Sequence, residues 1–302
     1  MAYTSIYRTL HRTFLWRWSV VFYLEPRQAI INDINARLMT FYRGVRDEYS
    51  NLRRELDEIE LLYTNNRNEF DALKTVHPDE RVDDKNEKLY YRLRAMFNGT
   101  IDKSYSDALL YYYINKTAYS GMILYNTKGE FNVPFGRYVH LTTKSVTLAH
   151  SKLLQRTEIL NTDYSKVFNM CKDDDFVFLD PPYDCIFSDY GNAEYKDGFN
   201  EERHIRPAND FANLPCKALM IIGRTPLTEE LYKGYIVDEY EKNYVVNIRN
   251  RFKAAAKHIV VANYRKCWDN IHVCSSQYAV YNNPKTTQLR LFEARQPYGT
   301  NR

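Results

Sequence analysis

The stretch FVFLDPPY, residues 176–183, decides the fold. Its first half is an unbroken apolar run as long as a short β-strand. Its second half, Asp180-Pro181-Pro182-Tyr183, ends that strand, because each proline fixes φ and lacks a backbone N–H. In open α/β sheets, ligands bind beyond the carboxyl ends of the strands. We therefore expect a binding or catalytic site at the Asp-Pro-Pro-Tyr stretch.

On both sides of this stretch, short apolar runs alternate with segments of helical spacing. Helices are expected near 201–213 and 227–233, and strands at 28–32, 157–160, 217–222 and 258–263. Apolar runs separated by helices are typical of a parallel sheet that is covered on both faces. The sequence therefore predicts an α/β domain built on a parallel sheet.

The middle of the chain has a different pattern. Predicted helices, in chain order, are 36–63, 86–97, 105–125 with a break at Ser120-Gly121, and 143–154. Residues 126–138 combine Gly, Asn and Pro, which favours a loop or hairpin. Because strand-like runs resume only at 157, residues 50–150 are interpreted as a mainly helical insertion into the α/β domain.

Overall composition excludes several classes of protein. The 302 residues carry a net charge of +4, and no apolar run approaches the roughly 18 residues that a membrane-spanning helix needs. The N-terminus shows no signal-peptide core, and the five cysteines form no CxxC pair or metal-binding spacing. We expect a cytoplasmic protein with reduced thiols and no metal centre. The mild positive charge is compatible with a polyanionic partner.

The Asp-Pro-Pro-Tyr residues also suit a particular chemistry. The Asp180 carboxylate and the carbonyl next to it can both accept hydrogen bonds from an exocyclic NH₂ group, and the Tyr183 ring can stack on the base that bears it. A proline-stiffened strand exit with a capping aspartate is the alternative reading.

Several segments together resemble the Dam-like (D12-type) DNA adenine-N6 methyltransferases. They occur in that family's order: AIINDIN (29–35), FNVPFGRY (131–138), ILNTDYSKVF (159–168), FLDPPYD (178–184), GFNEERH (198–204) and HIVVANY (258–264). The resemblance implies a Rossmann-like S-adenosylmethionine-dependent methyltransferase sheet with an inserted target-recognition region, acting on N6 of adenine in double-stranded DNA. It divides the chain into 1–49, the first part of the cofactor and catalytic domain; 50–150, target recognition; 151–270, the catalytic domain; and 271–302, a tail.

The resemblance also assigns roles to single residues. Asp33 matches the acidic residue that binds the cofactor's ribose hydroxyls, and Asp163 matches the acidic position near the cofactor's adenine; a helix N-cap and a turn aspartate are the alternatives. Asp180, also placed at the cofactor, and Tyr183 hold the adenine that has been flipped out of the duplex, while Pro181 and Pro182 shape the turn. Methyl transfer is direct, with no cysteine nucleophile and no metal.

Other matched positions lie in loops. Asn132, Pro134 and Arg137 fall in the family's recognition region and are candidates for contact with DNA, or are ordinary loop residues. Phe199 and His204 match the loop after the catalytic strand, where helix entry and packing are the simpler explanation.

One segment departs from the family. Where Dam-like enzymes carry a Glu-Pro-Phe-x-Gly-x-Gly loop, this chain has HRTFLWRWS (11–19). Trp and Arg in place of glycines would fill the space of the cofactor's methionine part. Trp has a single codon, TGG. If the gene is read one nucleotide later, the codons that span Trp16-Arg17 and Trp18-Ser19 must therefore encode Gly. In the same shifted frame, the codons of residues 11–15 can encode Ile-Glu-Pro-Phe-Cys. We expect a frameshift that scrambled residues 5–22, with weakened cofactor binding. A drifted N-terminus, and a catalytically dead DNA-binding relic, are the alternatives.

The tail holds one further motif. Gln288, Leu289, Leu291 and Phe292 resemble the Gln-Leu-x-Leu-Phe peptide by which bacterial DNA enzymes bind the sliding clamp. A terminal strand with its apolar residues buried on the domain is the alternative. The resemblance thus implies a DNA-associated protein, with a clamp as a possible second partner.

Overall fold

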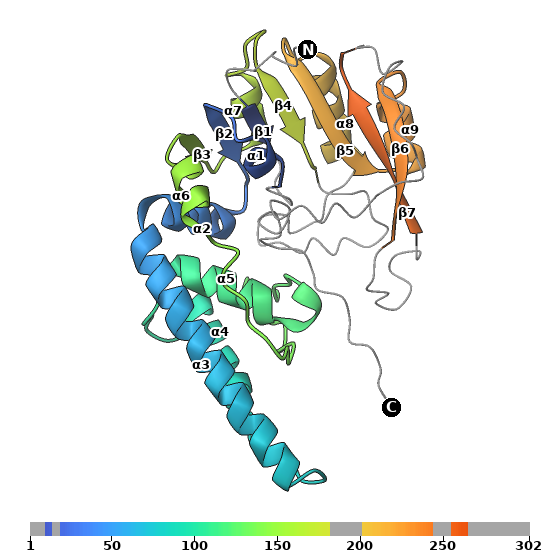
Figure 1. The fold of residues 1–302 in the computed structure, drawn as a ribbon. Helices are drawn as coiled ribbons and strands as arrows, with labels where there is room; N and C mark the ends of the chain where they lie inside the picture. The colour runs from blue at the N-terminus through green and yellow to red at the C-terminus, as the bar shows by residue number, and fades with distance from the viewer. Residues whose placement is uncertain (1–9, 14–18, 182–200, 244–254, 265–302) are drawn as a thin grey trace, which may run out of the picture.

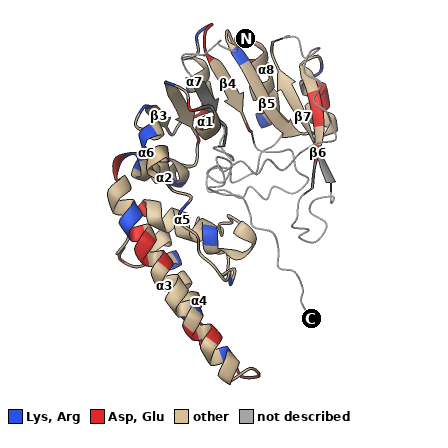
Figure 2. Ribbon diagram, viewed as in Figure 1, with Lys and Arg blue, Asp and Glu red and all other residues tan. Residues whose placement is uncertain are grey.

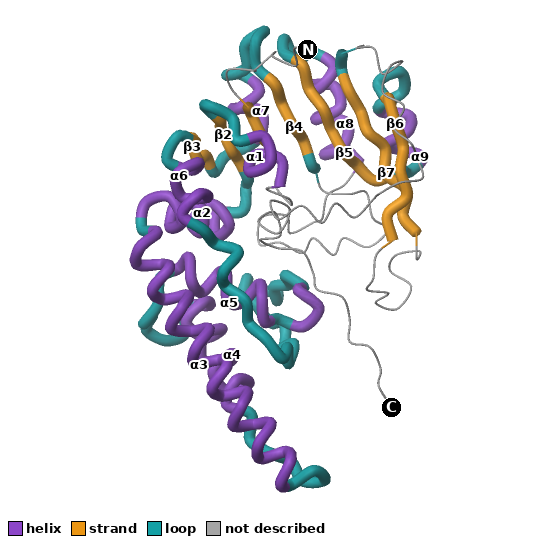
Figure 3. The backbone as a smooth tube through the Cα atoms, viewed as in Figure 1, coloured by secondary structure: helices purple, strands orange, loops and turns teal. Residues whose placement is uncertain are grey.

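The computed structural model describes residues 10–13, 19–181, 201–243 and 255–264. Within these residues the strands form one seven-stranded sheet in the order β3-β2-β1-β4-β5-β7-β6 (Figures 1 and 3). The strands are β1 (Leu10–Thr13), β2 (Ala29–Asn32), β3 (Thr157–Leu160), β4 (Phe176–Leu179), β5 (Lys217–Gly223), β6 (Ile236–Asn243) and β7 (Ala255–Ala262). Every apolar run that the sequence analysis assigned to a strand lies in this sheet.

The strand directions correct one expectation. Strands β3, β2, β1, β4 and β5 are parallel, as predicted, but β7 runs antiparallel to both of its neighbours. The segment between β6 and β7, residues 244–254, is shorter than the dozen or more residues that a parallel crossover needs. An apolar run shows that a strand is buried, and it carries no information on the strand's direction.

Two strands were not predicted. β6 lies at the edge of the sheet and reads IVDEYEKN, and its acidic residues conceal it from a search for apolar runs. β1 reads LHRT and lies in the middle of the parallel block, between β2 and β4. A central strand normally consists of apolar residues. The sequence analysis therefore assigned this segment only to the divergent N-terminal region.

Helices pack against the carboxyl-terminal half of the sheet. They are α7 (Tyr164–Phe168), α8 (Glu201–Ala212) and α9 (Pro226–Leu231), and the short α1 (Ser19–Leu24) precedes β2. Buried side chains of β4 and β5, such as Val177 and Met220, form one cluster with Phe211 of α8 and with Tyr232, which follows α9. This packing fixes α8 and α9 against the sheet. The two helices predicted near 201–213 and 227–233 are confirmed as α8 and α9.

The remaining helices all lie between β2 and β3 in the sequence. They are α2 (Ala36–Asp47), α3 (Tyr49–Val76), α4 (Lys85–Asn98), α5 (Asp107–Thr117), the short 3₁₀ turn η1 (Tyr119–Gly121) and α6 (Leu148–Leu154). Side chains cap α2, α4 and α5 at their first residues: Asn35, Asp84 and Ser106 each accept a backbone N–H. In Figure 1, α3 and α4 lie side by side and extend away from the sheet.

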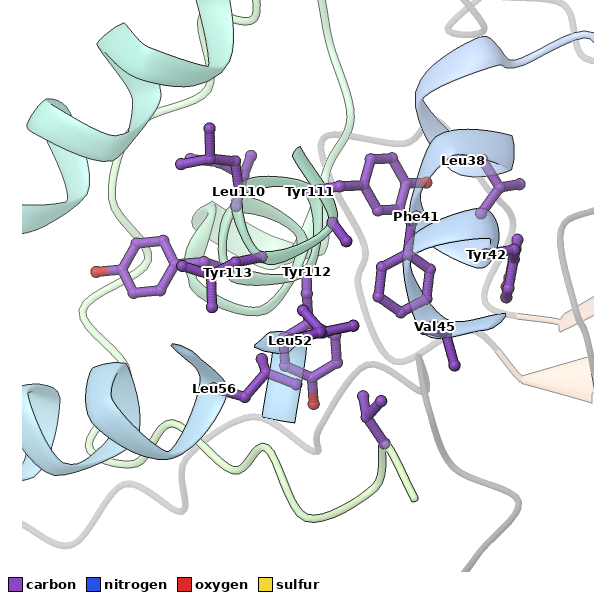
Figure 4. Close-up of a cluster of buried hydrophobic side chains, with 14 of the residues drawn as sticks. Leu38, Phe41, Tyr42, Val45, Leu52, Leu56, Leu110, Tyr111, Tyr112 and Tyr113 are labelled. Atoms are coloured by element: carbon purple, nitrogen blue, oxygen red, sulfur yellow. The ribbon is translucent and has the colours of Figure 1, made fainter. Parts of the chain in front are cut away.

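Helix α5 is the centre of this helical region. Its residues Leu110, Tyr111, Tyr112 and Tyr113 are all buried, on every side of the helix, and Phe41 of α2 lies beside Tyr111 and Tyr112 (Figure 4). A helix that is buried all round must be enclosed by other elements. Helices α2, α3 and α4 pack around α5, and several of the chain's tyrosines are buried between these helices.

The helix limits differ from the sequence prediction in three places. The predicted 36–63 helix is divided at Glu48, and its second part, α3, continues to Val76. Ion pairs one turn apart, Arg54–Glu58 and Arg67–Asp71, support its polar continuation, and Figure 2 shows both signs of charge along it. The 105–125 helix stops earlier than expected, at Thr117. The predicted 86–97 helix is confirmed as α4.

The third difference concerns the predicted 143–154 helix, which begins only at Leu148. Thr147 and His150 form a capping box there, and the backbone N–H of Thr147 donates to His150 Nδ1 at 3.1 Å. Burial lowers the pKa of His150 to about 4, so the ring is neutral and this nitrogen can accept. Upstream, the backbone N–H of Thr143 donates to Glu60 of α3, and the Val146 N–H donates to the Thr143 carbonyl, so residues 143–146 form a turn in place of the predicted first helical turn.

None of the described helices is long and apolar enough to cross a lipid bilayer.

A close approach of α2 and α5 generates a stability prediction. A Cβ added at Gly44 would lie 2.5 Å from Cβ of Ala108, which is buried. Gly44→Ala should therefore lower the free energy of unfolding by about 1–3 kcal/mol through overpacking, measured by urea denaturation. The double change Gly44→Ala with Ala108→Gly should recover part of that loss, and Ser50→Ala on the exposed face of α3 should be neutral. A Gly44→Ala chain as stable as the parent would contradict the close approach.

Candidate active site

Three acidic residues from distant parts of the sequence lie at one edge of the sheet. Asp33 follows β2, Asp163 comes shortly after β3 and Asp180 follows β4. The parallel register pairs Thr13 with both Asn32 and Leu179, and it pairs Asn32 with Leu160, so these strands end at the same level. The structure thus brings together the predicted cofactor residues and the first residue of the Asp-Pro-Pro-Tyr motif.

The turn that holds Asp33 is fixed by hydrogen bonds. Its Oδ1 accepts the backbone N–H of Asn35 at 2.7 Å, and Asn35, rather than Asp33, is the N-cap of α2. The side-chain amide of Asn161 donates to the backbone oxygens of Asp33 and Ile34 at 2.7 and 2.9 Å. The alternative reading of Asp33 as the helix cap is therefore wrong. The side chain is half-buried at the end of β2.

A second pair of bonds ties the ends of β2 and β3 together. The Asn32 side chain donates to the Thr162 carbonyl at 2.8 Å and accepts from the Thr162 N–H at 2.9 Å. Asn32 is itself almost fully buried. A buried amide that is satisfied in this way fixes the distance between the two turns, and hence the distance between the backbones of Asp33 and Asp163.

Asp163 has several partners. It is the N-cap of α7, and its Oδ1 accepts the backbone N–H and the hydroxyl of Ser165 at 3.0 and 2.6 Å. The same oxygen lies 3.1 Å from Nη2 of Arg206. Burial raises the pKa of Asp163, but the bonds from Ser165 and Arg206 outweigh burial and hold the pKa below its ordinary value. The carboxylate is therefore ionised at neutral pH.

Arg206 of α8 belongs to a network that the sequence analysis did not find. Its guanidinium lies 5.0 Å from the centre of the Tyr164 ring and 3.9 Å from the carboxylate of Asp210, one turn along the helix. The Tyr164 hydroxyl donates to Asp210 at 2.6 Å. Burial first, and this bond second, raise the pKa of Tyr164 above its ordinary value, so the phenol stays protonated. The segment GFNEERH ends just before Arg206, and no motif marked it.

Asp180 is buried at the end of β4, with 8% of its surface exposed, and Pro181 after it is buried as well. Pro182, Tyr183 and Phe199 lie outside the described residues, so their predicted roles stay predictions. His204 lies inside α8 and is almost fully buried. Its position agrees with the packing role that the sequence analysis weighed for it.

The predicted DNA-contact residues form a separate group, in the segment between η1 and α6. Asn132, Pro134 and Arg137 are exposed, while the residues that alternate with them, Phe131, Val133 and Phe135, are buried. Residues 131–135 thus alternate between an apolar inward row and an exposed outward row, and the alternation ends before Arg137, which is exposed as well. An antiparallel bridge joins Tyr125 to Phe131, in agreement with the predicted loop or hairpin at 126–138.

Side chains of the helices hold this segment by its backbone. The Tyr90 hydroxyl donates to the Val133 carbonyl at 2.8 Å, and the Asn98 amide bonds both the N–H and the carbonyl of Phe131 at 2.9 Å. A Cβ at Gly136 would lie 2.9 Å from the carbonyl oxygens of Thr117 and Ala118, so only glycine fits there. The outward row is therefore presented on a fixed backbone.

Arg137 has a backbone φ of 54°, in the left-handed region, and its guanidinium lies 3.3 Å from the carboxylate of Glu87 in the first turn of α4. Both side chains are partly exposed. An exposed ion pair of this kind is weak, at about 0–1 kcal/mol. A polyanion could therefore compete with Glu87 for Arg137.

Within the described residues, no group of three or more His, Cys, Asp or Glu side chains could hold a metal ion.

Comparison with known proteins gives the family. The model of the D12 class N6 adenine-specific DNA methyltransferases matches residues 18–248. The chain is 34% identical over 241 residues to the Type II methyltransferase M.CviBI of Paramecium bursaria Chlorella virus NC1A, covering 78% of this chain and 81% of that protein.

Bacterial proteins match as well. The Type II methyltransferase M1.LlaDCHI of Lactococcus lactis subsp. cremoris is 28% identical over 268 residues, which is 85% of this chain and 87% of that protein. The DNA adenine methylase of Salmonella typhi is 28% identical over 244 residues, covering 78% and 77%. Since the family match includes β2 to β6 and the Asp-Pro-Pro-Tyr strand exit, the chain belongs to the D12 class of N6 adenine-specific DNA methyltransferases.

Proposed function

We propose that this methyltransferase takes its methyl group from S-adenosylmethionine and acts on adenine in duplex DNA at the edge formed by Asp33, Asp163 and Asp180. The observation that carries the proposal is the shared level of the ends of β3, β2 and β4, which gathers these acidic residues in a chain of the D12 class. The strand order supports a Rossmann-like methyltransferase sheet, with ligands at this edge.

The residues present fit the adenosine part of this cofactor. Ribose hydroxyls and the exocyclic amine of adenine are hydrogen-bond donors, and ionised carboxylates are strong acceptors. Asp33 would accept from the ribose, Asp163 from the adenine amine, and Asp180 borders the cofactor at the end of β4. When bound, the cofactor supplies an electrophilic methyl group on a positively charged sulfur.

Asp180 and the Pro181 carbonyl would hold the target. An adenine inside a duplex must be swung out of the stack before its N6 is reached. Two acceptors would then take the two N–H groups of the amine, orient its nitrogen and draw its lone pair out of conjugation with the ring. Because Asp180 is buried, its hydrogen bonds to the amine face little competition from water. Tyr183 would stack on the base.

The helical region between β2 and β3 would recognise the DNA. The exposed residues Asn132, Pro134 and Arg137 support this role, since Asn132 and Arg137 offer hydrogen-bond donors and side chains of the helices hold the backbone of the segment. The four-part division at residues 49, 150 and 270 is retained as a proposal, and the protein is placed with DNA in the cytoplasm. The tail residues Gln288 to Phe292 lie outside the described residues, so contact with a sliding clamp stays a prediction.

The N-terminal segment is the part that fits the cofactor least. In the sequence, residues 14–18 come directly after β1, where the family's glycine loop would be expected, and they read Phe-Leu-Trp-Arg-Trp. The family match begins only at residue 18, the last residue of this segment. Both observations support the frameshift hypothesis. The DNA-binding relic, the alternative function, is not favoured by the relatives, whose names are those of enzymes.

Replacement of residues 11–18 by Ile-Glu-Pro-Phe-Cys-Gly-Gly-Gly tests that hypothesis. Glycines remove the side chains that would occupy the methionine space, so the replaced chain should bind S-adenosylmethionine about tenfold or more tightly in calorimetry. Replacement of the same residues by a scrambled order of the original ones is the control. Equal affinity of the original and glycine-containing chains would favour the drifted N-terminus.

In the chain that carries the glycine replacement of residues 11–18, Asp180→Ala should abolish methylation and leave the dissociation constant for DNA within a few-fold, because one carboxylate orients the amine while backbone contacts supply most of the affinity. Incorporation of a labelled methyl group and fluorescence anisotropy measure the two quantities. Asp173→Ala, at an exposed position before β4, is the matched control. Turnover above a few per cent in Asp180→Ala would remove Asp180 from the reaction.

Arg137→Ala should weaken DNA binding for all sequences alike and reduce the slope of log affinity against log salt by about 1, since it removes one phosphate-seeking charge. Glu87→Gln should leave that slope unchanged and raise affinity slightly, because it frees Arg137 from its partner. Lys233→Ala, exposed beyond α9, is the control. An unaltered salt slope in Arg137→Ala would mean that Arg137 does not meet DNA.

A further inference from the structure

We infer that Arg206 is a positioning residue that holds Asp163 as the acceptor for the cofactor's adenine amine and thereby sets the preference for adenine in the cofactor. The inference rests on the proposed role of Asp163. Its starting point is the position of the Arg206 guanidinium, which lies between two carboxylates, Asp163 on one side and Asp210 on the other, over the ring of Tyr164.

The two oxygens of Asp163 are differently occupied. Oδ1 accepts the Ser165 N–H, the Ser165 hydroxyl and Nη2 of Arg206, at 3.0, 2.6 and 3.1 Å. Three donors saturate one carboxylate oxygen. Oδ2 has a single long contact in the described part of the chain, to Nη1 of Arg206 at 3.5 Å. Acceptor capacity therefore remains on Oδ2, and the guanidinium fork fixes its direction.

Arg206 also decides which kind of donor suits this oxygen. A lone carboxylate at a sheet edge would favour a cation, but the guanidinium beside it cancels the charge while both groups stay ionised. The pair then suits a neutral N–H donor, such as the exocyclic amine of adenine. A carbonyl in the same place, as in hypoxanthine, would face the carboxylate oxygen with its own lone pairs and be rejected.

Arg206 is in turn fixed from its own helix. Asp210 lies one turn further along α8, and the hydroxyl of Tyr164, which neighbours Asp163, donates to Asp210 at 2.6 Å. Tyr164 therefore contacts the network twice, with its hydroxyl on Asp210 and with its ring under Arg206. The same contacts attach α8 to α7, and a variant that weakens this attachment alone distinguishes the two roles.

The test compares two nucleosides on the full chain. Dissociation constants are measured by calorimetry for S-adenosylhomocysteine and for its counterpart with hypoxanthine in place of adenine. The parent chain should prefer the adenine compound about tenfold or more. Arg206→Met should reduce that ratio at least about threefold, the weakening expected when one hydrogen bond loses its orientation. Arg206→Lys, which keeps the charge without the fork, should give an intermediate ratio.

Tyr164→Phe is the control for attachment, because it removes the hydrogen bond from α7 to Asp210 of α8 and leaves both ion pairs of Arg206 and the ring beside it in place. It should lower the melting temperature and leave the ratio of affinities unchanged. If Arg206→Met also lowers only the melting temperature, Arg206 is an attachment residue and the inference is wrong.

Methylation by the parent chain is assayed in parallel. Activity without any preference for adenine in the cofactor would remove Asp163 from the adenine and overturn this inference, while the proposed function stands. Where the original residues 11–18 prevent binding by the parent chain, the same variants are compared in the chain that carries the glycine replacement of these residues. Failure of both chains to bind either nucleoside would overturn the proposed cofactor site and the inference with it.

Discussion

The rest of the molecule depends on the register of four parallel strands, which are paired so that they end at the same level. Thr13, Asn32, Leu160 and Leu179 end β1, β2, β3 and β4 at the same height. A parallel sheet places all its chain exits at one edge, so residues that lie far apart in the sequence share that edge without any contact designed between them. A shift of one residue in β2, β3 or β4 would turn the side chains of that strand to the opposite face and move the acidic residue that follows it away from the other two.

In the helical region, the segment 131–138 is held by hydrogen bonds from side chains to its backbone. In the helical region, tyrosine hydroxyls and an asparagine amide meet the carbonyls of the segment 131–138, and Tyr63, for example, donates to the carbonyl of Tyr138. Such bonds depend on the position of the supporting helix and hardly at all on the identity of the residue that is held. The outward residues of the segment can therefore differ between relatives while the platform under them stays the same.

The sequence predicted those features that depend on local pattern. Apolar runs located β2, β3, β4, β5 and β7, and the strand exit after β4 located Asp180. Asp33 and Asp163 were identified from the resemblance to the family rather than from the pattern of the chain. β1 and β6 escaped prediction because Arg12 and Glu239 interrupt any apolar pattern, and the direction of β7 depends on the length of a connection rather than on burial. Arg206 could not have been found, since its partners Asp163 and Asp210 become neighbours only when α7 and α8 pack together.

The place of β1 in the sheet bears on the order in which the chain acquires its structure. One neighbour of β1 is β2, which is synthesised soon after it and ends at Asn32. Its other neighbour is β4, which ends only at Leu179. The whole helical region separates β2 from β3 in the sequence. Contacts between distant residues form slowly, whereas helices form from local contacts. During synthesis the helices from α2 to α6 can therefore assemble while β1 still has an open side. The helical region would then act as a folded spacer that brings β3 back to β2, and the sheet closes last, around its central strand.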